Sequence, residues 1–177
     1  MLPLATPPVL RRLLPAGGFR RGSTVSVTGS LTLLLALLAE AASAGARVTA
    51  VGMPVVVGLV PGEVATLPNP GPAWARVVAE LLHVRGAVVV LPAGAVGARD
   101  AEQLAALARQ CGSVLVCHGP AWAAADVLLE ETPGSWPPFR GGRELGVQVR
   151  GRGPAARPVR ALLRLPMRPP ALSVATA

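Results

Sequence analysis

The feature that most constrains the fold is an ordered strand, turn, helix and second strand near the start of the chain. Residues 24–28 (TVSVT) alternate and are rich in β-branched side chains, and residues 31–43 are rich in Leu and Ala. Gly45 stands where a C-terminal helix cap is expected, and residues 47–53 (RVTAVGM) have the pattern of another strand. This order predicts a parallel β–α–β crossover unit.

Further apolar runs extend the predicted sheet. Residues 87–91 (AVVVL) and 113–117 (SVLVC) are continuously apolar, which is typical of central parallel strands covered on both faces. Apolar residues at helical spacing predict helices over 74–83 and 99–110. Shorter strands are expected at 64–67 and 126–130.

The pattern changes in the last third of the chain. Residues 145–149 and 159–165 alternate apolar and polar side chains, and 151–158 join them, which predicts an antiparallel hairpin with arginines at its tip and outer face. The segment 54–63 is too short and too rich in Pro and Gly for a helical crossover. The sheet surface beside it would stay exposed unless Val55–Val57, Leu59 or a partner covers it.

The length of 177 residues suits one domain. We divide it into an N-terminal entry and docking segment (1–23), a core (24–165) and a flexible tail (166–177). All 17 basic residues are Arg, so no chemistry that depends on Lys is possible. Eight of these arginines, against Glu144 alone, lie in residues 139–177, which suggests an acidic surface or nucleic acid as partner.

Two absences in the sequence indicate the compartment of the protein. The longest apolar run, 31–38, is far shorter than the ~20 residues that span a bilayer, so we expect no membrane protein. Prolines at 3, 7 and 8 interrupt any secretory signal, and Cys111 and Cys117 are the only cysteines. We therefore expect a cytoplasmic, nucleoid-associated protein.

Two segments resemble the RecA family of ATPases. The stretch LPAGGFRRGSTVSVTGS, the Leu-rich helix and AGARVTAVGM resemble that family's entry loop, first strand, phosphate loop, helix and second strand. ADVLLE and LGVQVRGRGPAARPVRALLRL resemble its final strands. The resemblance implies an α/β fold of the RecA-like, P-loop NTPase type: a truncated, mostly parallel sheet flanked by helices and ending in an antiparallel hairpin. More narrowly, the chain resembles the actinobacterial mutasome accessory proteins of the ImuA-prime type.

The phosphate loop itself is degenerate. A working loop reads G-x-x-x-x-G-K-[ST], in which backbone N–H groups and the Lys hold the phosphates. Here Thr28, Gly29, Ser30 and Thr32 stand in its place, without the second Gly or the Lys. No acid ends the strand 87–91 to position magnesium, and Asp100 is better explained by the dipole of its own helix. We expect no bound nucleotide, although weak anion binding at the helix N-terminus stays open.

Other chemistry has little support. Ser30, His118 and Asp126 could be imagined as a triad, but no G-x-S-x-G motif surrounds any serine. Cys111, Cys117, His83 and His118 lack the spacing of a zinc site. We therefore expect neither an enzyme nor a metal or organic cofactor.

Two surfaces are candidates for binding. The hairpin arginines suit DNA phosphates or an acidic protein surface, although a merely solvated face is equally compatible with them. Apolar side chains of the entry segment and of the Pro-rich loop suit docking on a partner or a second copy. The arginines are Arg150, Arg152, Arg157, Arg160 and Arg164, and the docking candidates are Leu10, Leu13, Leu14, Phe19, Trp136 and Phe139.

These features lead to one hypothesis and two alternatives. The resemblance implies a non-enzymatic accessory protein of damage-induced, error-prone (translesion) DNA synthesis. Its implied partners are a Y-family-like polymerase protein and an error-prone replicative polymerase. The alternatives are a module that binds the DNA backbone through the hairpin and a divergent NTPase that uses Arg in place of Lys.

Overall fold

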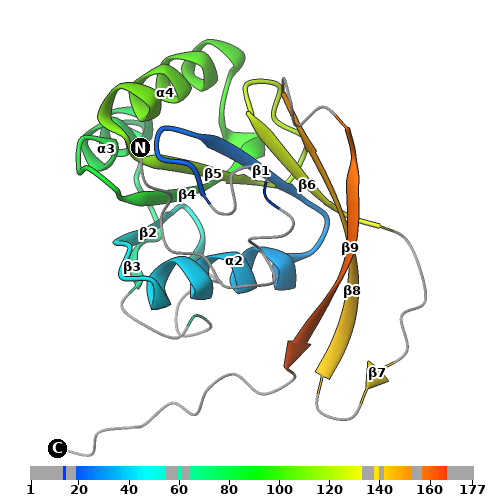
Figure 1. Cartoon of the computed structure of the whole chain (residues 1–177). Coiled ribbons are helices and arrows are strands. Elements are labelled where there is room, and N and C mark those ends of the chain that lie inside the picture. Colours follow the sequence, from blue (N-terminus) through cyan, green and yellow to red (C-terminus); the bar gives the residue numbers. More distant parts are fainter. Residues whose placement is uncertain are drawn as a thin grey trace, which may run out of the picture.

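The computed structural model describes residues 14, 19–54, 60, 64–132, 138–139, 142–152 and 157–166 (Figure 1). Within them the chain forms an α/β fold, and the predicted elements appear within one to three residues of their expected bounds. The elements are β1 (Thr24–Thr28), α2 (Leu31–Ser43), β2 (Val48–Val51), β3 (Val64–Leu67), α3 (Trp74–Leu82), β4 (Val88–Pro92), the short 3-10 helix η2 (Ala93–Ala95), α4 (Ala98–Cys111), β5 (Val114–His118), β6 (Val127–Glu131), β7 (Pro138–Phe139), β8 (Gly142–Gly151) and β9 (Val159–Pro166).

The strands form one mixed sheet in the order β3-β2-β4-β5-β1-β6-β8-β7, with β9 also paired to β8. The pairs from β3 to β6 are parallel, whereas β8 runs antiparallel to β6, β7 and β9. The expected parallel sheet and closing antiparallel hairpin are therefore confirmed. β1 lies between β5 and β6, so the first strand of the chain is central.

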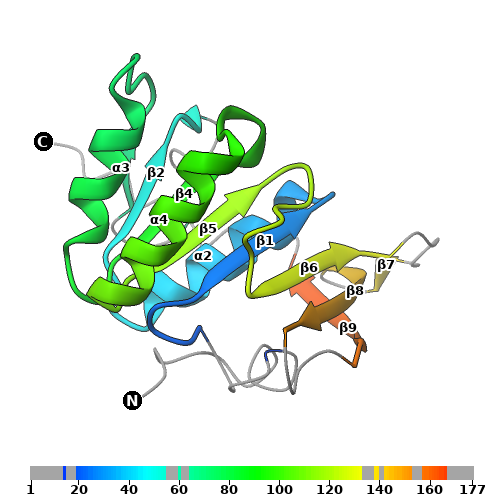
Figure 2. The ribbon, with the colours of Figure 1, turned by 90° about the horizontal axis from the view of Figure 1, so that it is seen from above.

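Helices cover the two faces of the parallel strands, as Figures 1 and 2 show. On one face, Val25, Val27 and Val116 join a core cluster with Leu33, Leu34 and the other buried leucines of α2. On the other face, Val89 and Leu115 pack with α3 and α4. The alternation of side chains along each strand sends successive residues to opposite clusters.

Helix α2 begins and ends where the sequence predicts. Ser30 is the N-cap in extended conformation, although its side chain makes no capping hydrogen bond. At the other end, Gly45 has a φ of +80°, and its N–H donates to the carbonyl of Ala42 at 2.9 Å. A left-handed glycine therefore ends the helix, as expected for this position.

The start of β6 fastens the hairpin end of the sheet to the centre. The Thr24 N–H donates to Asp126 Oδ2 at 2.9 Å, and the Asp126 N–H donates to the Thr24 carbonyl at 2.8 Å. The Arg152 N–H in turn donates to the Asp126 carbonyl at 3.1 Å. One aspartate thus connects β1, β6 and the end of β8.

The structure corrects one expectation about the entry segment. Leu14 and Phe19 were expected to dock on a partner, but they are only 4% and 2% exposed and belong to the core cluster of α2. They are buried because α2 and the hairpin strands present apolar side chains, and Leu14 and Phe19 of the same chain cover these side chains. Leu10 and Leu13 lie outside the described residues.

The connection from β2 to β3 is described only in part. Met53 and Val60 are buried in the cluster around α2, so this connection contributes to covering that helix. Val55–Val57 and Leu59 lie outside the described residues. In the part of the chain that the structure describes, no helix has the length and apolar character needed to cross a membrane.

Candidate functional site

The turn from β1 to α2 is the place where a phosphate loop would lie. β1 ends at Thr28 and α2 begins at Leu31, so only Gly29 and Ser30 connect them. Gly29 has a φ of +89°, which lets the chain reverse direction in so short a turn. Thr28 Oγ1 donates to the Leu129 carbonyl at 3.5 Å, and Thr32 is exposed on the first turn of the helix. Two residues cannot form a loop that surrounds a phosphate chain.

A carboxylate lies beside this turn. A Cβ atom placed on Gly29 would be 3.4 Å from Glu131 Cβ and 3.9 Å from Glu131 Oε2. Glu131 ends β6, which is paired with β1, and Thr28 is in register with Glu130. A negative charge here repels a phosphate approaching the same helix N-terminus. Glu131 could not be found from the sequence, because only the pairing of β6 with β1 brings it to the turn.

His118 borders the turn from the other neighbouring strand. It ends β5, and Gly119 donates its N–H to the Val27 carbonyl at 3.0 Å. Burial lowers the pKa of His118 below its usual value, and a hydrogen bond with the Ser30 backbone partly opposes that shift. Its buried Nε2 has no hydrogen-bond partner in the structure. The neutral imidazole therefore lies beside the turn, at the C-terminal end of the parallel strands.

β4 is the strand that would supply a magnesium ligand in an NTPase, and it has no acid at its end. β4 ends at Pro92 and continues into Ala93–Ala95, so the residues that follow it are apolar or glycine. Asp100 lies in the first turn of α4, where its charge complements the helix dipole as expected.

The imagined catalytic triad is not assembled. His118 and Ser30 meet at the C-terminal end of the parallel strands, whereas Asp126 precedes β6 and bonds Thr24 at the opposite end of β1. Asp126 also pairs with Arg109, at 3.8 Å between Oδ1 and Nη1. Among the described residues, no group of three or more His, Cys, Asp or Glu side chains could hold a metal ion.

Cys117 is fully buried in the cluster below α3 and α4, and burial raises the pKa of its thiol. A thiol with a raised pKa is a poor nucleophile and a poor metal ligand. It acts in this position as a small apolar side chain.

Four of the hairpin arginines lie near the end of β8, near the start of β9 or between these two strands. Arg150, Arg152, Arg157 and Arg160 are exposed, as predicted. Arg160 Nε donates to Gln148 Oε1 at 3.0 Å, and an Nη atom of Arg152 donates to the Ala123 carbonyl. Arg164 lies on β9 opposite Glu144 in the register, and its side chain is outside the described residues.

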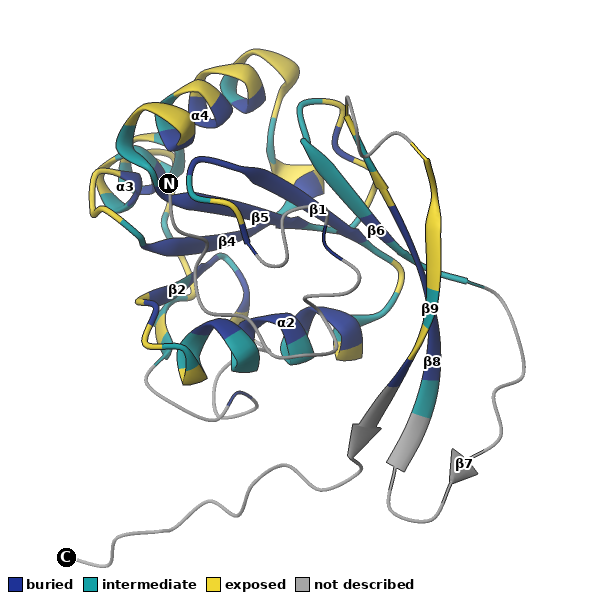
Figure 3. Cartoon of the chain, in the orientation of Figure 1, coloured by how far each residue is buried: buried dark blue, intermediate teal, exposed yellow. Residues whose placement is uncertain are grey.

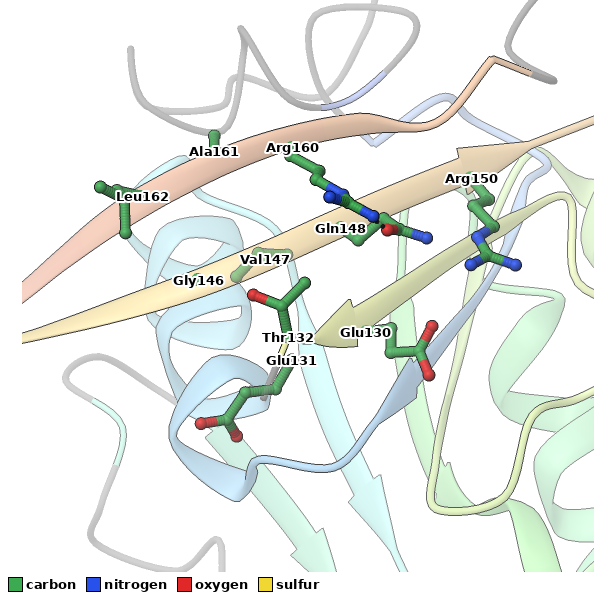
Figure 4. A pocket seen from close by; sticks show the side chains of 10 residues that line it. All are labelled: Glu130, Glu131, Thr132, Gly146, Val147, Gln148, Arg150, Arg160, Ala161 and Leu162. Carbon is green, nitrogen blue, oxygen red and sulfur yellow. Dashed lines mark hydrogen bonds between the residues drawn. The ribbon is translucent and has the colours of Figure 1, made fainter. Parts of the chain in front are cut away.

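Gln148, Arg150 and Arg160 also line a cavity of about 760 Å³ on the sheet, which Figure 4 shows from close by. Glu130 lines it from β6, and Leu162 lines it from β9. Thr132, the residue that follows β6, lines it as well. Glu130, Gln148 and Leu162 were not predicted from the sequence to belong to this site. Their shared face follows only from the register of β6, β8 and β9.

The side chains of both aromatic docking candidates lie outside the described residues. Trp136 lies outside the described residues. Phe139 belongs to β7, which pairs with the start of β8, but its side chain lies outside the described set.

Comparison with known proteins shows the family to which this chain belongs. No curated protein matches the chain. The family model described as the MT3502 N-terminal domain matches residues 12–124, which is more than half of the 177 residues. The match covers the elements from β1 to β5 and ends before β6, so the hairpin lies beyond it. The chain therefore belongs to the MT3502 N-terminal domain family.

Proposed function

We propose that this chain is a non-enzymatic, RecA-like accessory protein of damage-induced, error-prone DNA synthesis. Its role is to bind a polymerase protein of the Y-family-like type, in an assembly that also contains an error-prone replicative polymerase. The RecA-like assignment rests on the resemblance of the sequence and is supported by the central strand, tight turn and helix at β1 and α2.

The observation that carries the proposal is the state of the β1–α2 turn. The connection has two residues, Glu131 places a carboxylate beside it, and β4 ends in apolar residues. An NTPase needs a cradle of N–H groups, a cation for the phosphates and an acid for magnesium. With these parts missing, the functional surfaces of such a core are those that contact other macromolecules.

The test is genetic, with a nucleotide-binding measurement beside it. Deletion of the gene in the source organism should lower the frequency of mutations induced by DNA damage, and the wild-type gene should restore it. An unchanged frequency would refute the proposal.

The purified chain should show no thermal shift with millimolar Mg-ATP. Ligand at 100 times its Kd would stabilise the fold by about 2.7 kcal/mol, which raises the Tm of a chain of this size by about 5–11 °C. A shift of that size would instead favour the divergent NTPase.

A second candidate function is binding of the DNA backbone, which the four exposed hairpin arginines favour. Affinity should then fall steeply with salt, with a log–log slope of about −0.9 per phosphate contacted on duplex DNA. A shallow salt dependence would exclude this function as the main one.

A further inference from the structure

Among the described residues, the strands β6, β8 and β9 are covered on one face only. Leu129, Val147 and Leu163 point into the core cluster beneath them and are at most 3% exposed. The alternate residues point to the opposite face, on the side where α3 and α4 lie. Those helices contact β2, β4 and β5, and Figure 2 shows them ending short of the hairpin strands. Figure 3 shows exposed surface along β9.

A groove lies on this bare face. It is the cavity of about 760 Å³ noted above, and we name it the basic groove after Arg150 and Arg160 at its sides. In Figure 4, Glu130, Gln148, Arg150 and Arg160 lie along the groove, while Leu162 extends from β9 at the other end. Glu130, Gln148 and Arg160 are successive partners in the strand register, so they form a row across the three strands.

The groove holds one of its two cations in place. Gln148 is 5% exposed, and its Oε1 accepts from Arg160 Nε at 3.0 Å. This bond orients the guanidinium, whose two Nη atoms can still donate to a carboxylate. The described structure records no ion pair for Arg150 or Arg160. Two cations without counter-ions, one of them fixed by a buried amide, favour an anionic ligand.

The composition of the groove favours a protein over a nucleic acid. Glu130 lies in the same row as Arg160 and repels phosphates and carboxylates alike, so Leu162 separates the two kinds of ligand. Leu162 is 49% exposed at the edge of the groove, where an aliphatic side chain of a protein can contact it. A second copy of this chain is a poor occupant because two identical basic faces would repel each other.

We propose that the basic groove binds an acidic segment of the partner protein, with an aliphatic side chain on Leu162 and carboxylates on Arg150 and Arg160. This inference rests on the proposed function only in taking the partner to be a protein. It adds the surface and the chemistry of the partner's segment.

The test uses the full chain and a fluorescein-labelled peptide of twelve glutamates with one central leucine. R150Q/R160Q should weaken peptide binding about tenfold, measured by fluorescence anisotropy. The matched control R85Q/R99Q removes the same charge from exposed positions near α3 and α4 and should change the Kd less than twofold. Equal losses from both pairs would mean attraction by net charge alone and would overturn the proposal. Unchanged far-UV CD spectra would establish that both variants fold.

Leu162 separates the peptide from DNA. L162S should weaken binding of the Leu-containing peptide several-fold and leave a peptide with Ser in place of that Leu unaffected. Tighter binding of a labelled 20-bp duplex than of the peptide, lost in R150Q/R160Q and indifferent to L162S, would assign the groove to nucleic acid and overturn the proposal.

The gene deletion distinguishes this proposal from the function on which it rests. If R150Q/R160Q loses peptide binding yet restores damage-induced mutation fully, the groove proposal fails while the accessory function stands. If the deletion leaves mutation unchanged but the peptide binds as expected, the accessory function fails and the groove stands.

Discussion

Replacing Asp126 with Ala tests whether one side chain fastens the hairpin end of the sheet to β1. Asp126 Oδ2 accepts the Thr24 N–H at 2.9 Å, and Thr24 is 0% exposed. Without the carboxylate, that buried N–H loses its partner, because solvent cannot reach it. The cost of an unsatisfied buried donor is about 1–3 kcal/mol.

The ion pair of Asp126 with Arg109 should matter much less. Its atoms are 3.8 Å apart, and the two side chains are 51% and 33% exposed. Solvent screens such a pair, so we expect Arg109→Ala to cost about 0–1 kcal/mol. Asp126→Asn keeps an oxygen that can accept from Thr24 and should cost less than Asp126→Ala.

Urea unfolding followed by far-UV CD measures these differences. D126A should lower the free energy of unfolding by about 1–3 kcal/mol without changing the m-value, and lower the Tm by about 2–12 °C. D126N and R109A should lie between D126A and the wild type. If R109A proves as destabilising as D126A, the ion pair and not the Thr24 hydrogen bond provides the stability, and the reasoning is wrong.

Two further predictions concern backbone packing and pH. Gly22→Ala should destabilise the fold by about 2 kcal/mol or more, because Gly22 has a φ of +78° and a Cβ there would lie 3.1 Å from Arg109 Cα. Gly112→Ala, with a φ of +69° and no atom within 4 Å of its Cβ, should cost only about 1–2 kcal/mol; equal losses in thermal melts would contradict the packing argument. The pKa of His118 is lower in the folded state than in the unfolded state, so the unfolded state binds more protons below about pH 6.5. The neutral ring therefore contributes its full stability above that pH. This contribution to the free energy of unfolding falls as the pH drops. His118→Asn should therefore flatten the loss of stability between pH 7 and 5, and an unchanged pH slope would count against this role.

The sequence by itself determined the elements and the class of fold. The alternation in residues 24–28 and the apolar runs at 87–91 and 113–117 predicted parallel strands, which the register confirms. The Leu-rich run predicted α2 to the residue, and Gly45 its end. Such signals are local, because each reports the side-chain period of one element and the residue that interrupts it.

Only the tertiary structure decided what lies beside what. The entry of Leu14 and Phe19 into the core, against the expectation of an exposed docking segment, depends on how much apolar surface α2 and the hairpin leave open. Glu131 reaches the Gly29 turn because β6 pairs with β1, and Glu130, Gln148 and Arg160 align because three strands share one register. These contacts join residues from separate strands, so no periodicity within one segment reports them; they are set by strand order and by which face of the sheet the helices leave bare.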